Sequence, residues 1–303
     1  MKLSRAVQEF LADCLARGLA RSTVEAYDGD LHALVALASP DSVLAFTQTV
    51  VRAYFVALVE KGLSPASLAR KRAAVRAFGQ WGRRQRLWTD DPTENLQRVT
   101  HPERLPRPFN PDETARLMRL DLAPLDRVVR ALLYYTGLRV TPICQLTVAD
   151  LSFAEVVFED GTRFPGTIRS IGKGQKPLVT PMHPALKEVL FDWVLRQTDL
   201  KGHSWIISHR SGKLFTRRGI ALMTHRWGRL TGVPDCTPHR FRHTFATDLL
   251  RQGTDVRVIQ RLLSHANINT TMLYTRVTDQ QASQAILKLP AWAPPSTGDE
   301  PKL

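Results

Sequence analysis

Six side chains that could stabilise or attack a phosphate occur in order along this 303-residue chain. They are Arg139, Lys173, His239, Arg242, His265 and Tyr274. Arginines and imidazoles held in place suit the negative charge that builds on the non-bridging oxygens of a phosphate under in-line attack. A tyrosine hydroxyl can act as the nucleophile and hold the cut strand covalently. The series therefore indicates phosphodiester chemistry.

Ordinary structural roles are the alternative for each of these side chains. Arg139 ends the run YYTGLR and could simply complement a helix dipole. Lys173 lies between two glycines and could be a surface lysine at a turn, and Lys176 is a rival for any catalytic role. Tyr274 could be a packed core tyrosine. Its position nine residues after His265 favours the catalytic interpretation.

Five short motifs give these side chains a common context. Between residues 136 and 275 the chain contains, in order, TGLRV, IGKGQK, PHRFRHTFATDLL, LLSHA and TTMLYT. One such motif alone would be weak, but the ordered set is specific. With these motifs the chain resembles the tyrosine recombinases of the phage integrase family, and in length and layout it is similar to the Xer type.

The resemblance implies a role for each side chain. Tyr274 would attack a DNA phosphate, releasing a 5′-hydroxyl and forming a 3′-phosphotyrosyl bond. Arg139 and Arg242 would bind the non-bridging oxygens, for which guanidinium groups are suited. Lys173 would protonate the leaving oxygen as general acid, and His239 would accept a proton near the tyrosine.

His265 would be an additional phosphate donor, and neither a metal ion nor another cofactor is expected. The arginines and the lysine take over the charge stabilisation that magnesium supplies in nucleases. The spacing of three residues, Cys236, His239 and His243, could allow them to bind zinc. No fourth ligand is evident nearby in the sequence, which disfavours a metal site.

The chain departs from the family pattern in two places. The family usually has an acidic residue three positions after its first arginine, where this chain has Pro142. The segment between Asp150 and Lys173 is also longer than is typical. We therefore expect the hydrogen bonding of that acid to be missing or supplied elsewhere.

A formal net charge of +14 favours a polyanionic partner. A basic helix between residues 64 and 86 has few acidic residues to pair with its cations, which favours contact with a DNA backbone over a merely solvated face. The candidate DNA-binding residues are Arg70, Lys71, Arg72, Arg76, Arg83, Arg84, Arg217 and Arg218.

The pattern of apolar residues predicts a mainly α fold with two domains. Residues 1–97 form a core-binding DNA-binding domain of four helices, which is SAM-like in the family, and residues 98–109 form a linker rich in proline. Residues 110–290 form the catalytic domain, mixed α+β with a small antiparallel sheet, and residues 291–303 form a mobile tail.

Individual elements follow from caps and periodicity. Ser22 with Glu25, and Asn110 with Glu113, predict capping boxes at two helix starts. Gly137 predicts the end of the apolar helix 126–136. Strands are expected at 156–158, 167–171 and 177–180. Further helices are expected at 184–197, 217–231, 239–252, 255–264, 269–275 and 278–288.

Three dispersed cysteines, Cys14, Cys144 and Cys236, indicate reduced thiols in a cytoplasmic protein. We expect it to be associated with the nucleoid if DNA is its partner. No signal peptide or membrane-spanning segment is expected.

The leading hypothesis is a site-specific recombinase that acts as a tetramer on double-stranded DNA through a Holliday junction, in chromosome or plasmid dimer resolution or in mobile-element integration. The tetramer could be a homo-oligomer or a hetero-tetramer with a related recombinase. The family resemblance implies that helix 278–288 docks on a neighbouring copy; the alternative is packing on its own domain. Two further functions stay open, a type IB topoisomerase and a catalytically impaired DNA-binding protein.

Overall fold

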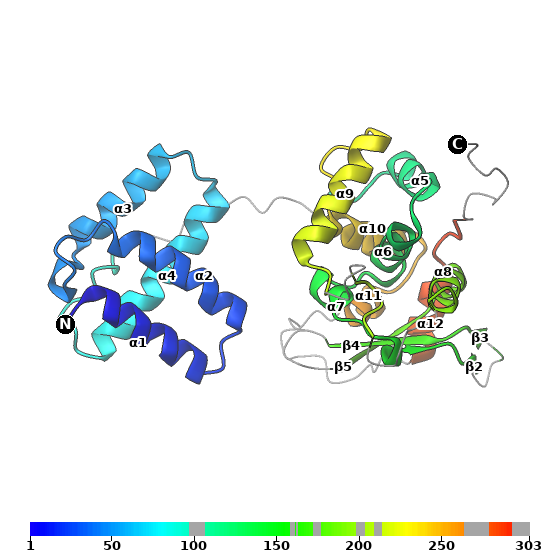
Figure 1. Cartoon of the computed structure of the whole chain (residues 1–303), viewed down its shortest axis with the longest axis horizontal. Coiled ribbons are helices and arrows are strands. Elements are labelled where there is room, and N and C mark those ends of the chain that lie inside the picture. Colours follow the sequence, from blue (N-terminus) through cyan, green and yellow to red (C-terminus); the bar gives the residue numbers. More distant parts are fainter. Residues whose placement is uncertain are drawn as a thin grey trace. The chain divides into compact units, whose positions relative to one another are not determined.

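The computed structural model describes residues 1–96, 107–157, 161, 163–171, 177–197, 204–208, 214–263 and 279–292. The chain forms two compact units, Met1–Arg104 and Leu105–Leu303 (Figure 1). The predicted helix 269–275, most of the predicted linker and most of the predicted tail lie outside the described residues. Within the described parts of the chain, no helix has the length and apolar character needed to cross a bilayer.

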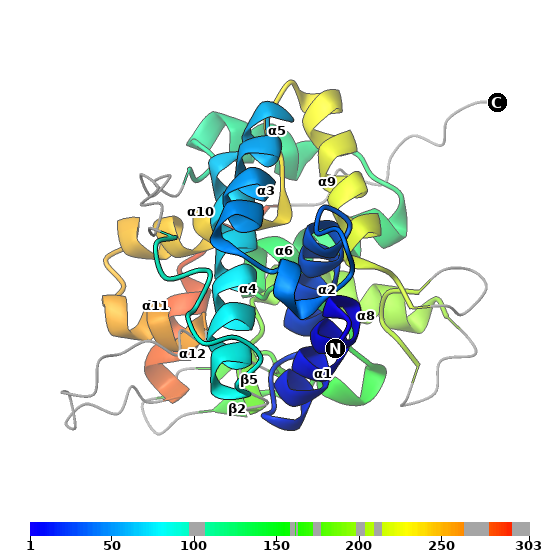
Figure 2. The same ribbon diagram turned by 90° about the vertical axis from the view of Figure 1, so that its left-hand side faces the viewer.

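Unit 1 is a small helical bundle. Its helices are α1 (Leu3–Ala16), α2 (Arg21–Val35), α3 (Gln48–Glu60) and α4 (Pro65–Arg84), with a 3-10 turn η1 (Val43–Ala45) before α3. Helix α4 packs against the other three helices (Figure 2). Ser64 caps α4 by accepting a hydrogen bond from the amide of Ser67, and Pro65 follows at the first helical position, as the sequence predicts.

An aromatic cluster fills the centre of this bundle. The ring of Phe10 lies 5.5 Å from that of Phe78 and 5.7 Å from that of Trp81, and Phe46 lies 5.2 Å from Phe78. Burial of each such ring stabilises the folded state by about 1.5–3 kcal/mol. Packing of these rings therefore holds together the parts of unit 1 that carry them. The predicted capping box of α2 is wrong: the helix begins at Arg21 with Ala20 as its N-cap, so Ser22 already lies inside it.

Unit 2 contains the remaining described helices. They are α5 (Pro111–Arg119), α6 (Pro124–Thr136), α7 (Val140–Cys144), α8 (Pro184–Leu195), α9 (Arg217–Thr231), α10 (Pro238–Arg251), α11 (Val256–Leu262) and α12 (Asp279–Leu287), with a 3-10 turn η2 (Val148–Asp150). Every residue from Val128 to Thr136 in α6 is buried. This apolar helix lies between α8 and α10 and is the core of the unit.

The predicted single sheet is in fact divided into two antiparallel sheets. Strands β1 (Leu151–Ser152), β4 (Thr167–Ile171) and β5 (Pro177–Pro181) form one in the order β1-β4-β5. Strands β2 (Val156–Val157) and β3 (Arg163–Phe164) form a separate pair. The extra length after Asp150 thus adds a hairpin beside the sheet and leaves the β4–β5 pairing regular.

The C-terminal part packs on its own unit. In α12 and just after it, Ala282, Ala285, Ile286 and Leu289 are buried. The imidazole Nε2 of His183 lies 2.9 Å from the carbonyl oxygen of Leu289. The structure therefore places the predicted amphipathic helix 278–288 on its own unit, which was the alternative to docking on a neighbouring copy.

Residues just outside both ends of the predicted catalytic domain pack in or against the core of unit 2. Phe109, predicted to end the linker, is buried in that core. Trp292, predicted to lie in a mobile tail, packs against it, and its amide donates to the hydroxyl of Tyr135. The compact unit is therefore longer at each end than the predicted range 110–290.

All three cysteines are free, as predicted, and all three are buried. Burial is the main cause that raises the pKa of each thiol, to about 11 for Cys144 and about 12 for Cys236. The pKa of Cys14 is also raised, by burial and then by the neighbouring Asp13.

Candidate active site

The turn between α6 and α7 presents Arg139. Helix α6 ends at Gly137, whose left-handed backbone (φ +59°) closes the helix. Leu138 is buried, so the chain turns its next side chain outward, and Arg139 is exposed at the N-cap of α7. Among the residues that the structure describes, Arg139 has no ion-pair partner.

Gly137 is required for two separate reasons. Residues with a Cβ rarely adopt its backbone conformation. A Cβ built there would also lie 2.5 Å from Cδ1 of Phe245 and 3.0 Å from Cδ2 of Leu263. The end of α6 therefore fits closely against α10 and α11, and this close approach sets the position of Arg139 relative to both.

Arg242 links the ends of two helices. One of its Nη atoms donates to the Gly137 carbonyl at 2.5 Å, and the other donates to the Leu263 carbonyl at 2.6 Å. The residue is 8% exposed. Burial, and then the positive charge of Arg139, lower its pKa to about 10. In the described structure its partners are these two carbonyls, and no carboxylate forms an ion pair with it.

A buried arginine next to an exposed one, with no carboxylate paired to either among the described residues, is an unusual arrangement. A shift of the Arg242 pKa from 12.5 to about 10 corresponds to a penalty on the order of 3 kcal/mol for its charged form. The group is still protonated at neutral pH. A bound phosphate would relieve this penalty, which is the behaviour expected of an anion-binding site.

His239 lies in the first turn of α10, three residues before Arg242, and its side chain is exposed. Its pKa is lowered by partial burial, then by Arg242 and then by Arg139. Its ring is also in edge contact with that of His243, with the centroids 4.2 Å apart. A neutral imidazole beside two guanidinium groups can accept a proton near a bound phosphate.

The structure thus brings together three of the six predicted catalytic residues. Lys173, His265 and Tyr274 lie outside the described residues, as does the rival Lys176. The residues that flank Lys173 are described and show which strands its segment joins. Residues Ile171 and Pro177, on either side of Lys173, are paired across β4 and β5.

Pro142 lies at a cavity of about 370 Å³ between α7 and the β4–β5 sheet. The same cavity is lined by Asp150, but this carboxylate accepts hydrogen bonds from the amide and hydroxyl of Thr147. Within the described residues, neither Arg139 nor Arg242 has a carboxylate that replaces the acid expected at position 142.

The alternative zinc site is not assembled. Cys236 is buried beside Gly228, whereas His239 is exposed. In the parts of the chain that the structure describes, no three histidine, cysteine or acidic side chains are grouped to hold a metal ion.

The predicted DNA-binding residues differ in accessibility. Arg83 and Arg84, in the last turn of α4, are exposed, as are Arg217 and Arg218 at the start of α9. These four can reach a phosphate backbone without breaking any contact that the structure records within the chain.

The other four candidates have intramolecular partners. Arg70 and Lys71 both form ion pairs with the buried Asp30, and the Lys71 side chain is only 14% exposed. The guanidinium of Arg72 lies 5.2 Å from the ring centroid of Phe55. Arg76 donates to the carbonyl of Leu96. Lys71 therefore has a structural role in unit 1.

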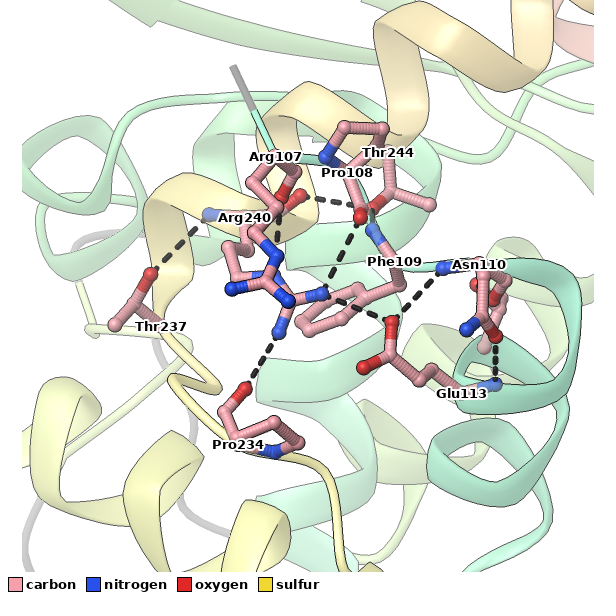
Figure 3. Close-up of polar contacts among 10 residues, drawn as sticks. Arg107, Pro108, Phe109, Asn110, Glu113, Pro234, Thr237, Arg240 and Thr244 are labelled. Carbon is pink, nitrogen blue, oxygen red and sulfur yellow. Dashed lines mark hydrogen bonds and ion pairs between the residues drawn. The ribbon is translucent and has the colours of Figure 1, made fainter. Parts of the chain in front are cut away.

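The sequence did not single out Arg240, which is buried and surrounded by hydrogen-bond acceptors (Figure 3). A signal was present: Arg240 and Thr244 are four residues apart, on the α10 face that also carries buried apolar residues. Such a position in a helix predicts an inward-facing arginine.

Comparisons with known proteins agree with this geometry. A family model described as "Phage integrase family" matches residues 109–281, and a second, "Phage integrase, N-terminal SAM-like domain", matches residues 7–86. "Tyrosine recombinase XerC" of Mycobacterium bovis (strain BCG / Pasteur 1173P2) is 34% identical over 285 residues, covering 89% of this chain and 92% of that protein.

Solved structures share the fold. A lambda integrase dimer bound to a COC' core site has a TM-score of 0.69 at 18% identity, covering 94% of this chain and 77% of that one. XerH bound to a palindromic difH substrate, a post-cleavage complex, has a TM-score of 0.65 at 20% identity, covering 84% and 76%. With one family model spanning more than half of its 303 residues and a relative 34% identical over most of its length, the chain belongs to the phage integrase family of tyrosine recombinases.

Proposed function

We propose that this chain is a site-specific DNA recombinase that cuts and rejoins DNA through a covalent bond to Tyr274. The observation that carries the proposal is the paired guanidinium site. Arg242 is buried and fixed by two carbonyls, Arg139 lies beside it, and neither has a carboxylate partner in the described structure. Such a site stabilises a phosphate whose negative charge increases during attack.

The reaction uses groups of the chain alone. The Tyr274 hydroxyl attacks phosphorus, and neutral His239 accepts its proton. The bond from phosphorus to the 5′-oxygen breaks, and Lys173 gives this oxygen a proton. Arg139, Arg242 and His265 hold the non-bridging oxygens. The phosphotyrosyl bond keeps the energy of the phosphodiester, so rejoining is the reverse reaction and needs no ATP.

Double-stranded DNA is the proposed partner, and the active assembly is a tetramer, of this chain alone or with a related recombinase. Four subunits on two sites can exchange strands in pairs through a Holliday junction. The net charge of +14 supports a DNA partner. The structural relatives include a lambda integrase dimer on a core site and XerH on difH, which supports assembly on DNA.

A suicide-substrate assay tests the function. Duplexes enriched from a random library by their affinity for the protein would be nicked near the cleavage point, so that the released fragment diffuses away. We expect a covalent protein–DNA adduct on a denaturing gel with wild type and none with Tyr274→Phe, and we expect the adduct to persist in EDTA.

The controls separate the competing functions. Binding without any adduct, with and without a related recombinase, would refute the recombinase and leave a DNA-binding protein. Relaxation of supercoiled plasmids that lack the selected site, by monomers, would instead identify a topoisomerase.

A further inference from the structure

Arg240 is a buried cation within the active-site helix that takes no part in the chemistry above. It lies between His239 and Arg242 in sequence, and 7% of the residue is exposed. Helix geometry places neighbouring side chains about 100° apart, so adjacent residues of α10 face different surroundings. His239 is exposed, while the side chain of Arg240 is enclosed within unit 2.

The guanidinium of Arg240 makes four hydrogen bonds (Figure 3). Its Nε donates to the carbonyl of Arg107 at 3.0 Å, and Nη1 donates to that of Pro234 at 2.5 Å. Its Nη2 donates to the carbonyl of Pro108 at 3.2 Å and to Oε2 of Glu113 at 2.9 Å. The Glu113 side chain is only 12% exposed, so this ion pair is shielded from solvent.

These contacts fasten the segment through which the chain enters unit 2, residues 107–110, here called the leading segment. It has no regular secondary structure, and side chains bond four of its backbone polar groups. Its carbonyls at positions 107 and 108 accept from Arg240, its amide at 109 donates to Thr244, and its amide at 110 donates to Glu113. Arg240 thus bonds to two of these four groups directly and to the acceptor of a third.

A second layer of contacts lies one helical turn further along α10. The hydroxyl of Thr244 donates to the Arg240 carbonyl at 2.8 Å and accepts from the Phe109 amide at 2.8 Å. The Phe109 ring packs against the first turn of α10, with its centroid 4.2 Å from Cζ of Arg240 and 5.0 Å from the centroid of Phe241. Leading segment and helix therefore share a continuous buried contact.

We propose that Arg240 is a positioning residue, which holds the first turn of α10 against the leading segment and thereby sets the places of His239 and Arg242. The catalytic part of this inference rests on the proposed function. Its consequence is a physical connection: the chain that arrives from unit 1 is bonded directly to the helix that carries two active-site side chains. Moving the leading segment moves that helix.

The test compares Arg240→Met with Arg130→Met in the full-length protein. Arg130 is a matched control because it is also buried, at 6% exposure, and also donates to two backbone carbonyls, those of Leu117 and Leu120. Those carbonyls lie at the end of α5 and not in the leading segment. Methionine keeps much of the arginine stem in both variants while removing the donors.

Hydrogen exchange without DNA is the first measurement. We expect Arg240→Met to accelerate amide exchange in peptides covering residues 107–111 and 237–243, and Arg130→Met to leave both at wild-type rates. Unchanged exchange at 237–243 in Arg240→Met would overturn the inference, and this result does not depend on whether the protein cleaves DNA.

Single-turnover cleavage at saturating DNA is the second measurement. We expect Arg240→Met to cleave about 10- to 100-fold more slowly than Arg130→Met, because small displacements of catalytic groups have effects of this size. The dissociation constant for DNA should be the same in the two variants. Equal cleavage rates would overturn the inference, whereas absence of a Tyr274-dependent adduct in wild type would refute the proposed function and leave exchange to decide.

Thr244→Val serves if Arg240→Met does not fold. Valine has nearly the shape of threonine but cannot accept the Phe109 amide, so the second layer of contacts weakens while Arg240 stays. We expect Thr244→Val to show faster exchange in both peptides. A further variant, Arg240→Lys, keeps the ion pair to Glu113 but not the set of carbonyl bonds. The cleavage rate of Thr244→Val should lie between that of wild type and that of Arg240→Lys. Wild-type exchange and cleavage in both Thr244→Val and Arg240→Lys would contradict the inference.

Discussion

At the scale of single residues, Arg242 combines a structural and a chemical task. Its two carbonyl contacts join Gly137, two residues before Arg139, to Leu263, two residues before His265. Both partners are neutral, so the positive charge stays available for a substrate anion. The same bonds that fix the cation therefore also join the chain segments that lead to two other candidate catalytic residues, Arg139 and His265.

Arg242→Lys should lose most activity and some stability. A lysine ammonium has no planar fork and cannot replace both carbonyl contacts in their present geometry. We expect cleavage to fall by about 100-fold or more and the free energy of unfolding to fall by about 1–3 kcal/mol. Suicide-substrate cleavage and urea denaturation would measure these effects. Arg229→Lys, at an exposed position in the last turn of α9, should change neither quantity.

The lowered pKa of His239 predicts the acid limb of the pH–rate profile. Only the neutral imidazole accepts a proton, so the midpoint of the acid limb should lie below pH 6.5, the ordinary pKa. The same shift favours the folded state above pH 6.5, and this contribution is lost as pH falls through the lower folded pKa.

Single-turnover rates between about pH 5 and pH 8 would measure this limb. His239→Gln should lack it and retain a low rate that does not depend on pH in this range. An acid limb of wild type centred above about pH 7 would contradict a lowered pKa.

At the scale of elements, the close packing of the ends of α6 and α11 against α10 determines the site. The end of α6 contacts Phe245 of α10 and Leu263 after α11, and the carbonyl that Arg242 uses belongs to the same residue, Gly137. Anything that separates these helix ends would separate Arg139 from Arg242.

Gly137→Ala should therefore be more damaging than the same change elsewhere. The methyl group of alanine must displace the Phe245 ring, and the alanine residue must adopt a left-handed backbone conformation. We therefore expect a loss of about 2–4 kcal/mol in the free energy of unfolding, and a lower cleavage rate. Gly253 is a matched control in the same unit, with φ +72° but no atom within 4 Å of the place that a methyl group would occupy. Gly253→Ala should cost only about 1 kcal/mol, and thermal unfolding of both variants would show whether packing accounts for the difference.

Local signals predicted many of the element boundaries. The capping box of Asn110 and Glu113 is present, and Gly137 ends α6 as predicted. Each of these signals acts within four residues. The start of α2 was mispredicted because Ala20 begins the helix without a side-chain cap, and no sequence rule marks such a start.

Short elements were harder to predict than long ones. Helix α7 has five residues, with Pro142 at its centre, and strands β1 and β3 have two residues each, so none has a measurable period. The division into two sheets depends on pairing partners rather than on composition.

Three members of the candidate site could be predicted only as types and order along the chain. Their convergence depends on contacts such as that between Arg242 and Gly137, which are 105 residues apart. The ion pair of Arg240 with Glu113 spans 127 residues and has no local signature. Sequence patterns therefore indicated the reacting groups, while the positions of those groups depend on packing between distant helices.

At the scale of the whole molecule, positive charge is divided between structural and available cations. Lys71 serves the buried Asp30, whereas Arg83 and Arg84 are exposed at the end of α4. The total of 42 lysines and arginines therefore overstates the number of cations that are free to meet DNA.

DNA binding should show this division. In Arg83→Gln/Arg84→Gln we expect the slope of log K against log salt to decrease by about 0.9 for each phosphate that the protein no longer neutralises. Lys71→Gln should leave the slope unchanged and destabilise unit 1 by about 1–3 kcal/mol, since Asp30 loses a partner. Binding titrations at several salt concentrations, with thermal unfolding, would distinguish the two. An unchanged slope in the double variant would exclude both arginines from the phosphate interface.

The buried cysteines make the molecule suitable for chemical labelling. Maleimides react with exposed thiolates, and Cys14, Cys144 and Cys236 are all buried, with pKa values raised above that of a free thiol. A cysteine introduced at an exposed position in each unit should therefore react selectively, without removal of the native ones. Fluorophores placed in this way on unit 1 and unit 2 would report the distance between the units by energy transfer, in free protein and on DNA.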